Sequence, residues 1–156
     1  MSPKGWSRDK DGLVAALILT AMVLHYGRSA EAILAEAEAE LGSFYFERQK
    51  VSGRKQGDAL AAALASRFGG LQSGDRLAIA GRTFRIARVV TLDGTKIVLD
   101  NGWWFGVRAS GTEPVVRPYA ETFVPAGSPE AGRAEAMEWH GKIMAWLRAE
   151  ISALVG

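Results

Sequence analysis

A run of twelve residues, Leu13 to Leu24, contains a single polar side chain, that of Thr20. Asp11 before the run and Gly27 after it are typical helix boundaries, so the run predicts a helix over residues 12–26. A surface helix has one apolar stripe, whereas a helix that is apolar all round needs cover on most sides. Twelve residues are also too few to cross a bilayer, which takes about 20. We therefore expect a buried helix, neither a signal peptide nor a membrane span.

The rest of the chain predicts a mixed fold. Residues 29–41, rich in Ala, Glu and Leu, predict a second helix capped by Ser29 and ended by Gly42. Two turn sequences, Asp93-Gly94 and 100–102, separate apolar runs and indicate hairpins. Pro118 suggests an edge strand or a bulge. Strands are expected over 43–52, 76–79, 83–90, 96–99, 103–107 and 115–124, and helices over 57–68 and 130–154. This order predicts an α+β fold with a mainly antiparallel sheet and flanking helices.

Composition excludes several kinds of site. The 156 residues contain no Cys and two His, which excludes disulfides and thiolate chemistry and disfavours a multi-histidine metal site. The absence of cysteine fits a reducing compartment, so we expect the cytoplasm. Residues 51–126 hold ten Lys and Arg against six Asp and Glu, while the two flanking segments are each slightly acidic. The positive charge is therefore local, which suits a small anionic ligand at least as well as a polyanion.

The segment 107–117 combines groups that bind anions. Arg108 offers a planar fork of donors, and Arg117 can bring a second cation to the same place. Ser110 and Thr112 add hydroxyl groups, and Gly111 allows backbone N–H groups to approach a ligand. An ordinary polar turn can look the same, so the two arginines give the pattern its weight. Phosphate binding is the chemistry that this set of residues favours.

Other charged residues near this segment have simpler interpretations. Glu113 would repel a phosphate if it pointed inward, so we expect it to face outward or to hold an arginine. Arg82, Arg85 and Arg88 on the predicted middle hairpin are interpreted as a solvated face rather than a nucleic-acid contact.

The sequence Arg-Ala-Ser-Gly-Thr-Glu-Pro at 108–114, followed by Arg117 and Tyr119, resembles the phosphate-binding loop of the α-D-phosphohexomutases. These are the phosphoglucomutases and phosphomannomutases. The segment 100–103 before the loop and 120–121 after it resemble the family's adjoining strands. Residues 6–12, with the apolar helix after them, resemble the end of the family's third domain. The resemblance extends over most of the chain and is weakest between about Val51 and Arg88.

The resemblance implies a role in a four-domain enzyme. In such mutases a serine of the first domain carries a phosphoryl group, and an aspartate-rich loop of the second holds Mg²⁺. The third domain reads sugar hydroxyls, and the fourth, whose fold resembles the TATA-box-binding protein, grips the substrate's phosphate. Residues that match the phosphate-gripping positions are Arg108, Ser110, Gly111, Thr112 and Arg117. Lys10 matches a substrate-binding lysine of the third domain.

Several family motifs have no counterpart in this sequence. It has no serine phosphoacceptor motif and no Asp-x-Asp-x-Asp loop, and residues 1–4 stand where a sugar-reading Glu-Glu-Ser is expected. We therefore expect residues 1–42 to be the last helices of an incomplete third domain and residues 43–156 to be the phosphate-binding domain. The missing N-terminal domains would cover the apolar helix and supply Mg²⁺, and this chain alone would have neither catalytic residues nor mutase activity.

Two other functions remain open. The chain could be a stand-alone module that binds a phosphorylated sugar or, less readily, nucleic acid, because its middle is basic. It could also be a structural fragment that self-associates through the apolar helix at 13–24. The partner favoured by the resemblance is a hexose phosphate, either glucose or mannose phosphate.

Overall fold

The computed structural model of the chain describes residues 12–52, 57–110, 113–127 and 129–155. Its strands form one antiparallel sheet in the order β1-β7-β6-β5-β4-β3, with β2 also paired to β7. The strands are β1 (Ser43–Arg48), β2 (Val51–Ser52), β3 (Arg76–Ile79), β4 (Arg82–Val90), β5 (Thr95–Leu99), β6 (Trp104–Ala109) and β7 (Val115–Val124). The helices are α1 (Gly12–Tyr26), α2 (Ala30–Leu41), α3 (Gly57–Phe68) and α4 (Pro129–Val155). The predicted α+β class is confirmed.

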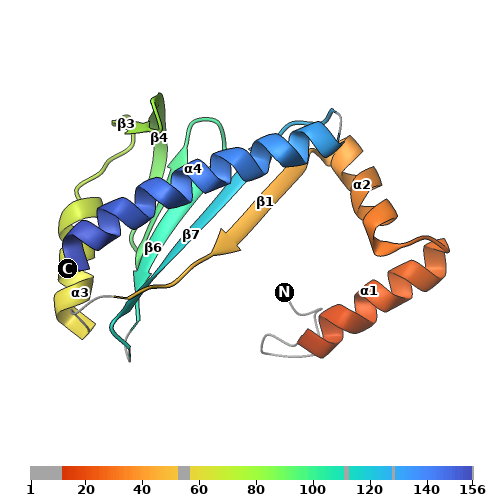
Figure 1. Cartoon of the computed structure of the whole chain (residues 1–156), viewed down its shortest axis with the longest axis horizontal. Coiled ribbons are helices and arrows are strands. Elements are labelled where there is room, and N and C mark those ends of the chain that lie inside the picture. The colour runs from red at the N-terminus through yellow and green to blue at the C-terminus, as the bar shows by residue number, and fades with distance from the viewer. Residues whose placement is uncertain (1–11, 53–56, 111–112, 128, 156) are drawn as a thin grey trace.

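One face of the sheet is covered by helices. The long helix α4 runs diagonally across β7 and β1, and α3 packs beside it at the end of β6 (Figure 1). Alternate residues of β6 and β7 point into this layer, so Phe105, Val116 and Ala120 are fully buried together with Leu147 of α4. The opposite face carries the intervening residues, among them Phe46 and Arg108, which are exposed.

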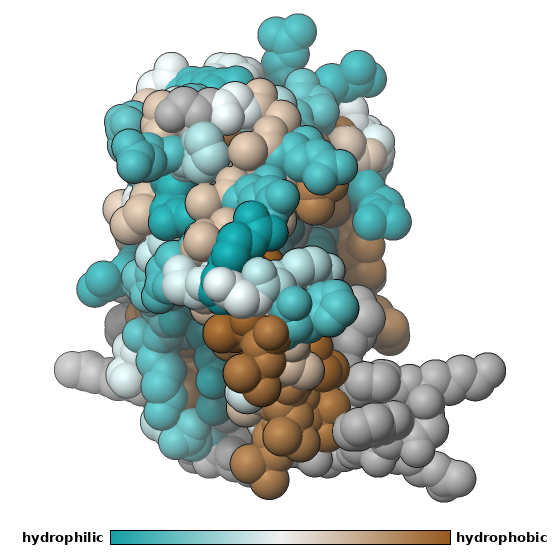
Figure 2. Space-filling model, turned by 90° about the vertical axis from the view of Figure 1, so that its right-hand side faces the viewer, coloured by the Kyte–Doolittle hydropathy of each residue, from teal (hydrophilic) through white to brown (hydrophobic). Residues whose placement is uncertain are grey.

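The two N-terminal helices lie away from this core. Ser29 caps α2 as predicted, because its hydroxyl oxygen accepts from the Ala32 N–H at 3.2 Å. The axes of α1 and α2 meet at 86°. No single helix among the described residues is long and apolar enough to cross a membrane; only this bent pair reaches that length and composition. The expectation of a buried helix is wrong for α1, because the sheet and α4 lie away from it: Val14 is its one buried residue and Leu17 is 61% exposed. Figure 2 shows apolar residues gathered on this part of the molecule.

An ion pair between buried Glu38 and half-exposed Arg133 ties α2 to the first turns of α4. The Glu38 carboxylate is 6% exposed and accepts two hydrogen bonds from the Arg133 guanidinium. This pairing raises the pKa of Arg133. Ser43, where β1 begins, donates its hydroxyl to the Pro129 carbonyl at 3.4 Å. The Glu38–Arg133 pair is therefore a polar link between α2 and the sheet domain, and the Ser43 hydrogen bond fixes the start of β1 against α4.

The position of Pro118 differs from the prediction. β7 lies inside the sheet, between β1 and β6, so the edge-strand interpretation is wrong. The register of β1 and β2 with β7 places Pro118 opposite Gln49, in the two-residue gap between β1 and β2. The neighbouring ladder is interrupted there, although the Gln49 N–H still reaches the Pro118 carbonyl at 3.1 Å. Proline lacks the N–H that would complete the pair with Gln49, and it is accommodated where the pairing of β1 and β2 with β7 is interrupted.

Candidate functional site

The two arginines of the predicted anion loop lie in strands. β6 extends to Ala109, two residues beyond the predicted end, and β7 begins at Val115. Arg108 and Arg117 are direct partners in the β6–β7 ladder, so their side chains share the open face of the sheet. Side chains of directly opposed residues are about 5 Å apart at Cβ, and both arginines line the same groove. The structure therefore brings together the pair on which the sequence argument depended.

A third cation continues this row. The common register of β1 and β2 with β7 places Lys50 opposite Arg117, on the same face. Arg48 lies two residues earlier on that face, opposite Tyr119. These side chains enclose a groove of about 600 Å³ lined by Arg48, Gln49, Lys50, Arg108, Arg117 and Tyr119. Directly opposed like charges are unfavourable unless something of opposite charge lies between them, so this groove is suited to an anion.

Two carboxylates hold the row of cations. Glu113 accepts a hydrogen bond from Arg117 at 3.1 Å and lies 3.6 Å from Lys50 Nζ, which confirms the expectation that it would hold an arginine. Asp93, in the turn between β4 and β5, lies 3.2 Å from Arg108 Nε. The Arg108 and Arg117 side chains keep 52% and 31% of their surface exposed, so both remain accessible to a ligand.

The β4–β5 turn packs against β6 beside Arg108 and brings Asp93 to its side chain. Both Asp93 and Gly94 have positive φ, +55° and +109°, as a tight hairpin turn between these strands requires. A Cβ at residue 94 would lie 2.5 Å from the Val107 carbonyl oxygen and 3.3 Å from Arg108 Cα. Only glycine therefore allows the turn to lie against β6, where Asp93 reaches the Arg108 side chain.

Comparison with known proteins assigns this architecture. The sequence model described as "Phosphoglucomutase/phosphomannomutase, C-terminal domain" matches residues 48–137, which include every residue that lines the groove. The chain belongs to the phosphoglucomutase/phosphomannomutase family. A phosphoglucomutase/phosphomannomutase of Thermococcus kodakarensis is 47% identical over 53 residues, 31% of this chain and 11% of that protein. A phosphoglucomutase of Komagataeibacter xylinus is 27% identical over 134 residues, 85% of this chain and 24% of that protein.

A solved structure shows the same fold. The exocytosis-sensitive phosphoprotein parafusin of Paramecium, a phosphoglucomutase crystallised in an open form, superposes with a TM-score of 0.57. The superposition covers 94% of this chain and 28% of parafusin, at 20% sequence identity. This chain thus spans about a quarter of the length of these longer family members.

The structure does not place the remaining predicted site residues in the groove. Ser110 is 4% exposed, its N–H donates to the Val115 carbonyl at 2.9 Å, and it is not among the described residues lining the groove. Gly111, Thr112 and Lys10 lie outside the described residues. Sequence reasoning missed Arg48 and Lys50. Their alternation at the end of a predicted strand was the available signal, but nothing local showed that this strand lies beside β7.

The described residues do not form a magnesium site. They contain no group of three or more His, Asp or Glu side chains that could hold a metal ion. Asp93 and Glu113, the two carboxylates of the groove, each neutralise cations instead of facing one another. The donor set around the groove therefore favours an anion, and we assign no step through Mg²⁺ to these residues.

Proposed function

We propose that this chain acts as the phosphate-binding domain of a phosphoglucomutase or phosphomannomutase, and that its groove holds the phosphate of a hexose phosphate. The observation that carries the proposal is the row of opposed cations, Arg108, Arg117 and Lys50, on one face of the sheet. Arg108 and Arg117 would each give charge-assisted hydrogen bonds to phosphate oxygens. Lys50 would contribute a point charge.

The proposed role is orientation. In a mutase that transfers a phosphoryl group within one sugar phosphate, holding one phosphate fixes the reacting end of the sugar against the catalytic group. The predicted loop residues Ser110, Gly111 and Thr112 would complete the grip. For Ser110, that requires the loop to turn its buried hydroxyl towards the groove. Lys10 would act from residues 1–42, which we assign to the end of a sugar-binding third domain.

Glu113 would weaken phosphate binding in the groove and so favour release of the ligand. When no ligand is bound, it neutralises Arg117 and Lys50, and a phosphate dianion would compete with it for both cations. Replacing Glu113 by Gln removes that competition while keeping the side-chain size. We expect E113Q to bind glucose 6-phosphate a few-fold more tightly, with a magnitude of about 1 kcal/mol for one partly exposed ion pair.

The proposal is tested by following backbone amides by NMR while glucose 6-phosphate is added, with glucose as the uncharged control. We expect shifts at the facing ends of β6 and β7 and in 48–50. Arg108→Ala should weaken binding about tenfold, since a half-exposed charge-assisted bond contributes about 1.5 kcal/mol. Arg148→Ala on α4 is the matched control, because Arg148 is also exposed and makes no ion pair with a described residue. Equal binding by both variants would overturn the proposal.

Two further measurements separate the alternatives. A phosphoglucomutase and phosphomannomutase assay on the purified chain should show no turnover above background, and turnover would refute the expectation that other domains supply the chemistry. Binding of one phosphate monoester should weaken modestly with salt, whereas a nucleic acid held by many phosphate contacts should weaken steeply. A steep salt dependence with tight oligonucleotide binding would favour the nucleic-acid module instead.

A further inference from the structure

A second pair of opposed arginines lies on the β3–β4 hairpin. Arg76 and Arg85 are direct partners in this ladder, and both are exposed on the outer face of the hairpin. Thr83 lies on the same face, one alternation along β4. The inner face carries Leu77 and Phe84, which are buried in the core. The hairpin thus presents two guanidinium groups and a hydroxyl to solvent from one side.

Neither arginine is neutralised by a described residue. Arg28, Arg67, Arg108, Arg117 and Arg133 each pair with a carboxylate within 4 Å, whereas Arg76 and Arg85 make no such pair within the described ranges. Arg82, next along the hairpin, is exposed as the sequence suggested, but it lies on the inner side against three aromatic rings and does not share the face of Arg85. Directly opposed like charges cost free energy, and no described carboxylate within ion-pair distance offsets that cost here.

The two arginines border a hollow of about 300 Å³, whose other lining residues are Thr83, Phe84 and Asp100. Asp100 is held there because its N–H donates to the Arg85 carbonyl at 2.9 Å. Its carboxylate makes no ion pair with either arginine among the described contacts. The base of the hairpin is fixed by the Ile86 N–H, which donates to the Asp75 carbonyl at 2.8 Å, and by the Ser73 hydroxyl, which donates to the Ala87 carbonyl at 2.9 Å. The arginines therefore project from a rigid backbone.

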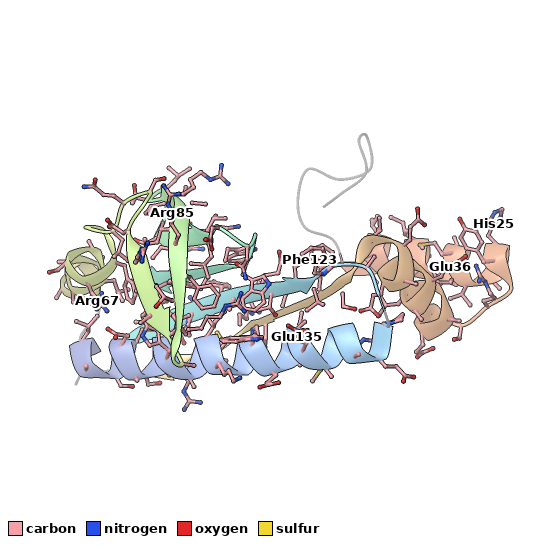
Figure 3. All side chains as sticks on the ribbon, turned by 90° about the horizontal axis from the view of Figure 1, so that it is seen from above. His25, Glu36, Arg67, Arg85, Phe123 and Glu135 are labelled. Atoms are coloured by element: carbon pink, nitrogen blue, oxygen red, sulfur yellow. The ribbon has the colours of Figure 1, made fainter. Side chains whose placement is uncertain are left out.

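This hollow is separate from the groove at β6 and β7. In Figure 1 the β3–β4 hairpin stands at the top of the sheet, and β6 ends at the bottom. Figure 3 shows Arg85 on the side of the molecule away from α4. The two sites lie at opposite ends of β5, because Asp100 of the hollow follows the last residue of that strand, whereas Thr95 at its start pairs with Val107 beside Arg108. One ligand of the size of a hexose phosphate cannot reach both places.

We propose that the hollow between Arg76 and Arg85 is a second anion site, which takes the phosphate group of a small soluble ligand. Two planar guanidinium groups that border one hollow can each bind phosphate oxygens, and the Thr83 hydroxyl in the same lining can donate to the same group. Bound phosphate would remove the repulsion between the arginines. The Asp100 carboxylate repels the anion, so the site is weak and fills only when phosphate or a phosphate ester is abundant.

The test uses the full chain, labelled with ¹⁵N, and titrates inorganic phosphate and, separately, glucose 6-phosphate against sodium chloride of equal ionic strength. Backbone amides and arginine Nε–H groups report the two sites independently. With inorganic phosphate we expect saturable shifts at 76–85 and at Asp100. The double variant Arg76→Ala/Arg85→Ala should weaken this binding about tenfold or more, as expected for losing two charge-assisted donors. The double variant Arg108→Ala/Arg117→Ala should leave it unchanged.

Two further variants decide the assignment even if the alanine variant folds poorly. Arg76→Lys/Arg85→Lys keeps the charge and loses the planar forks, so it should weaken binding several-fold if the geometry matters. Asp100→Asn should tighten phosphate binding at the hairpin and leave the groove unaffected. Saturation by glucose 6-phosphate with equal affinity would indicate that any monoester suffices, and preference for the sugar phosphate would indicate a sugar contact. The proposal is overturned if the hairpin shifts match those in chloride, or if Arg108→Ala/Arg117→Ala abolishes them.

Discussion

A single added methyl group at Gly94 tests the geometry of the groove. Gly94 has a φ of +109°, and its Cα lies against the β6 backbone at Val107 and Arg108. An alanine Cβ would lie 2.5 Å from the Val107 carbonyl oxygen, closer than real contacts allow, and 3.3 Å from Arg108 Cα and Cβ. The turn and β6 must therefore move apart to accommodate it.

Two costs add at this position. Positive φ costs an alanine about 1–2 kcal/mol relative to glycine. Crowding in a packed region adds about 1–3 kcal/mol because backbone, rather than a flexible side chain, is in the way. We therefore expect Gly94→Ala to lower the free energy of unfolding by about 2–5 kcal/mol. Separation of the turn from β6 also moves Asp93 away from Arg108, so glucose 6-phosphate binding should weaken.

Gly102→Ala is the matched control. Gly102 lies in the β5–β6 turn with a φ of +86°, and an added Cβ there would meet nothing within 4 Å. Its free energy of unfolding should fall only by the conformational cost of positive φ, about 1–2 kcal/mol, and its phosphate binding should be unchanged. Urea denaturation gives the stabilities, and the NMR titration gives the affinities. If the two variants lose equal stability and Gly94→Ala binds glucose 6-phosphate as well as the wild type, the close packing of the turn on β6 does not position Arg108.

Three other variants test the domain around the groove. Leu147→Ala removes a fully buried α4 side chain and should cost about 2–5 kcal/mol in urea denaturation. Burial lowers the pKa of His140 below 6.5, so the unfolded chain takes up a proton first and the free energy of unfolding should fall as the pH drops below about 6.5. His140→Phe should reduce this loss of stability between pH 7 and pH 5, measured by urea denaturation at both values. An unchanged loss would assign the pH dependence to other groups. Arg82→Ala removes a guanidinium that lies 5.4 Å from the Trp103 ring and 5.2 Å from the Trp139 ring, and should lower thermal stability by about 1 kcal/mol.

Local patterns predicted most elements within one or two residues. The β3 strand matches its predicted range, and α4 begins and ends within one residue of the prediction. Asp93-Gly94 formed the expected turn because few other residue pairs accept its dihedral angles. The strand predicted over 43–52 divides into β1 and β2, and the interruption lies opposite Pro118, which no local pattern near residue 49 reveals.

The residues of the groove that the sequence could not predict are those brought there by pairing between strands far apart in the chain. Arg48 and Lys50 join Arg117 only because β1 pairs with β7, some 70 residues later in the chain. The sequence placed Arg108 and Arg117 around a shared loop, and their proximity followed from that hairpin. The apolar composition of α1 indicated that the helix needs cover on most sides. Leu17 and its neighbours are exposed, so the described residues do not supply that cover.

The arrangement of charge in the groove favours capture and release over tight binding. Lys50, Arg117 and Arg108 form a row of three cations across three strands, yet Glu113 and Asp93 already compensate part of that charge. An incoming phosphate must displace these carboxylates, so its net gain is the difference between two sets of ion pairs, each weakened by solvent. A groove without the carboxylates would bind phosphate more strongly but would hold three uncompensated cations when empty. The carboxylates therefore lower the cost of the empty state, and under the proposed function a phosphate ester that has to dissociate after the reaction would benefit from that balance.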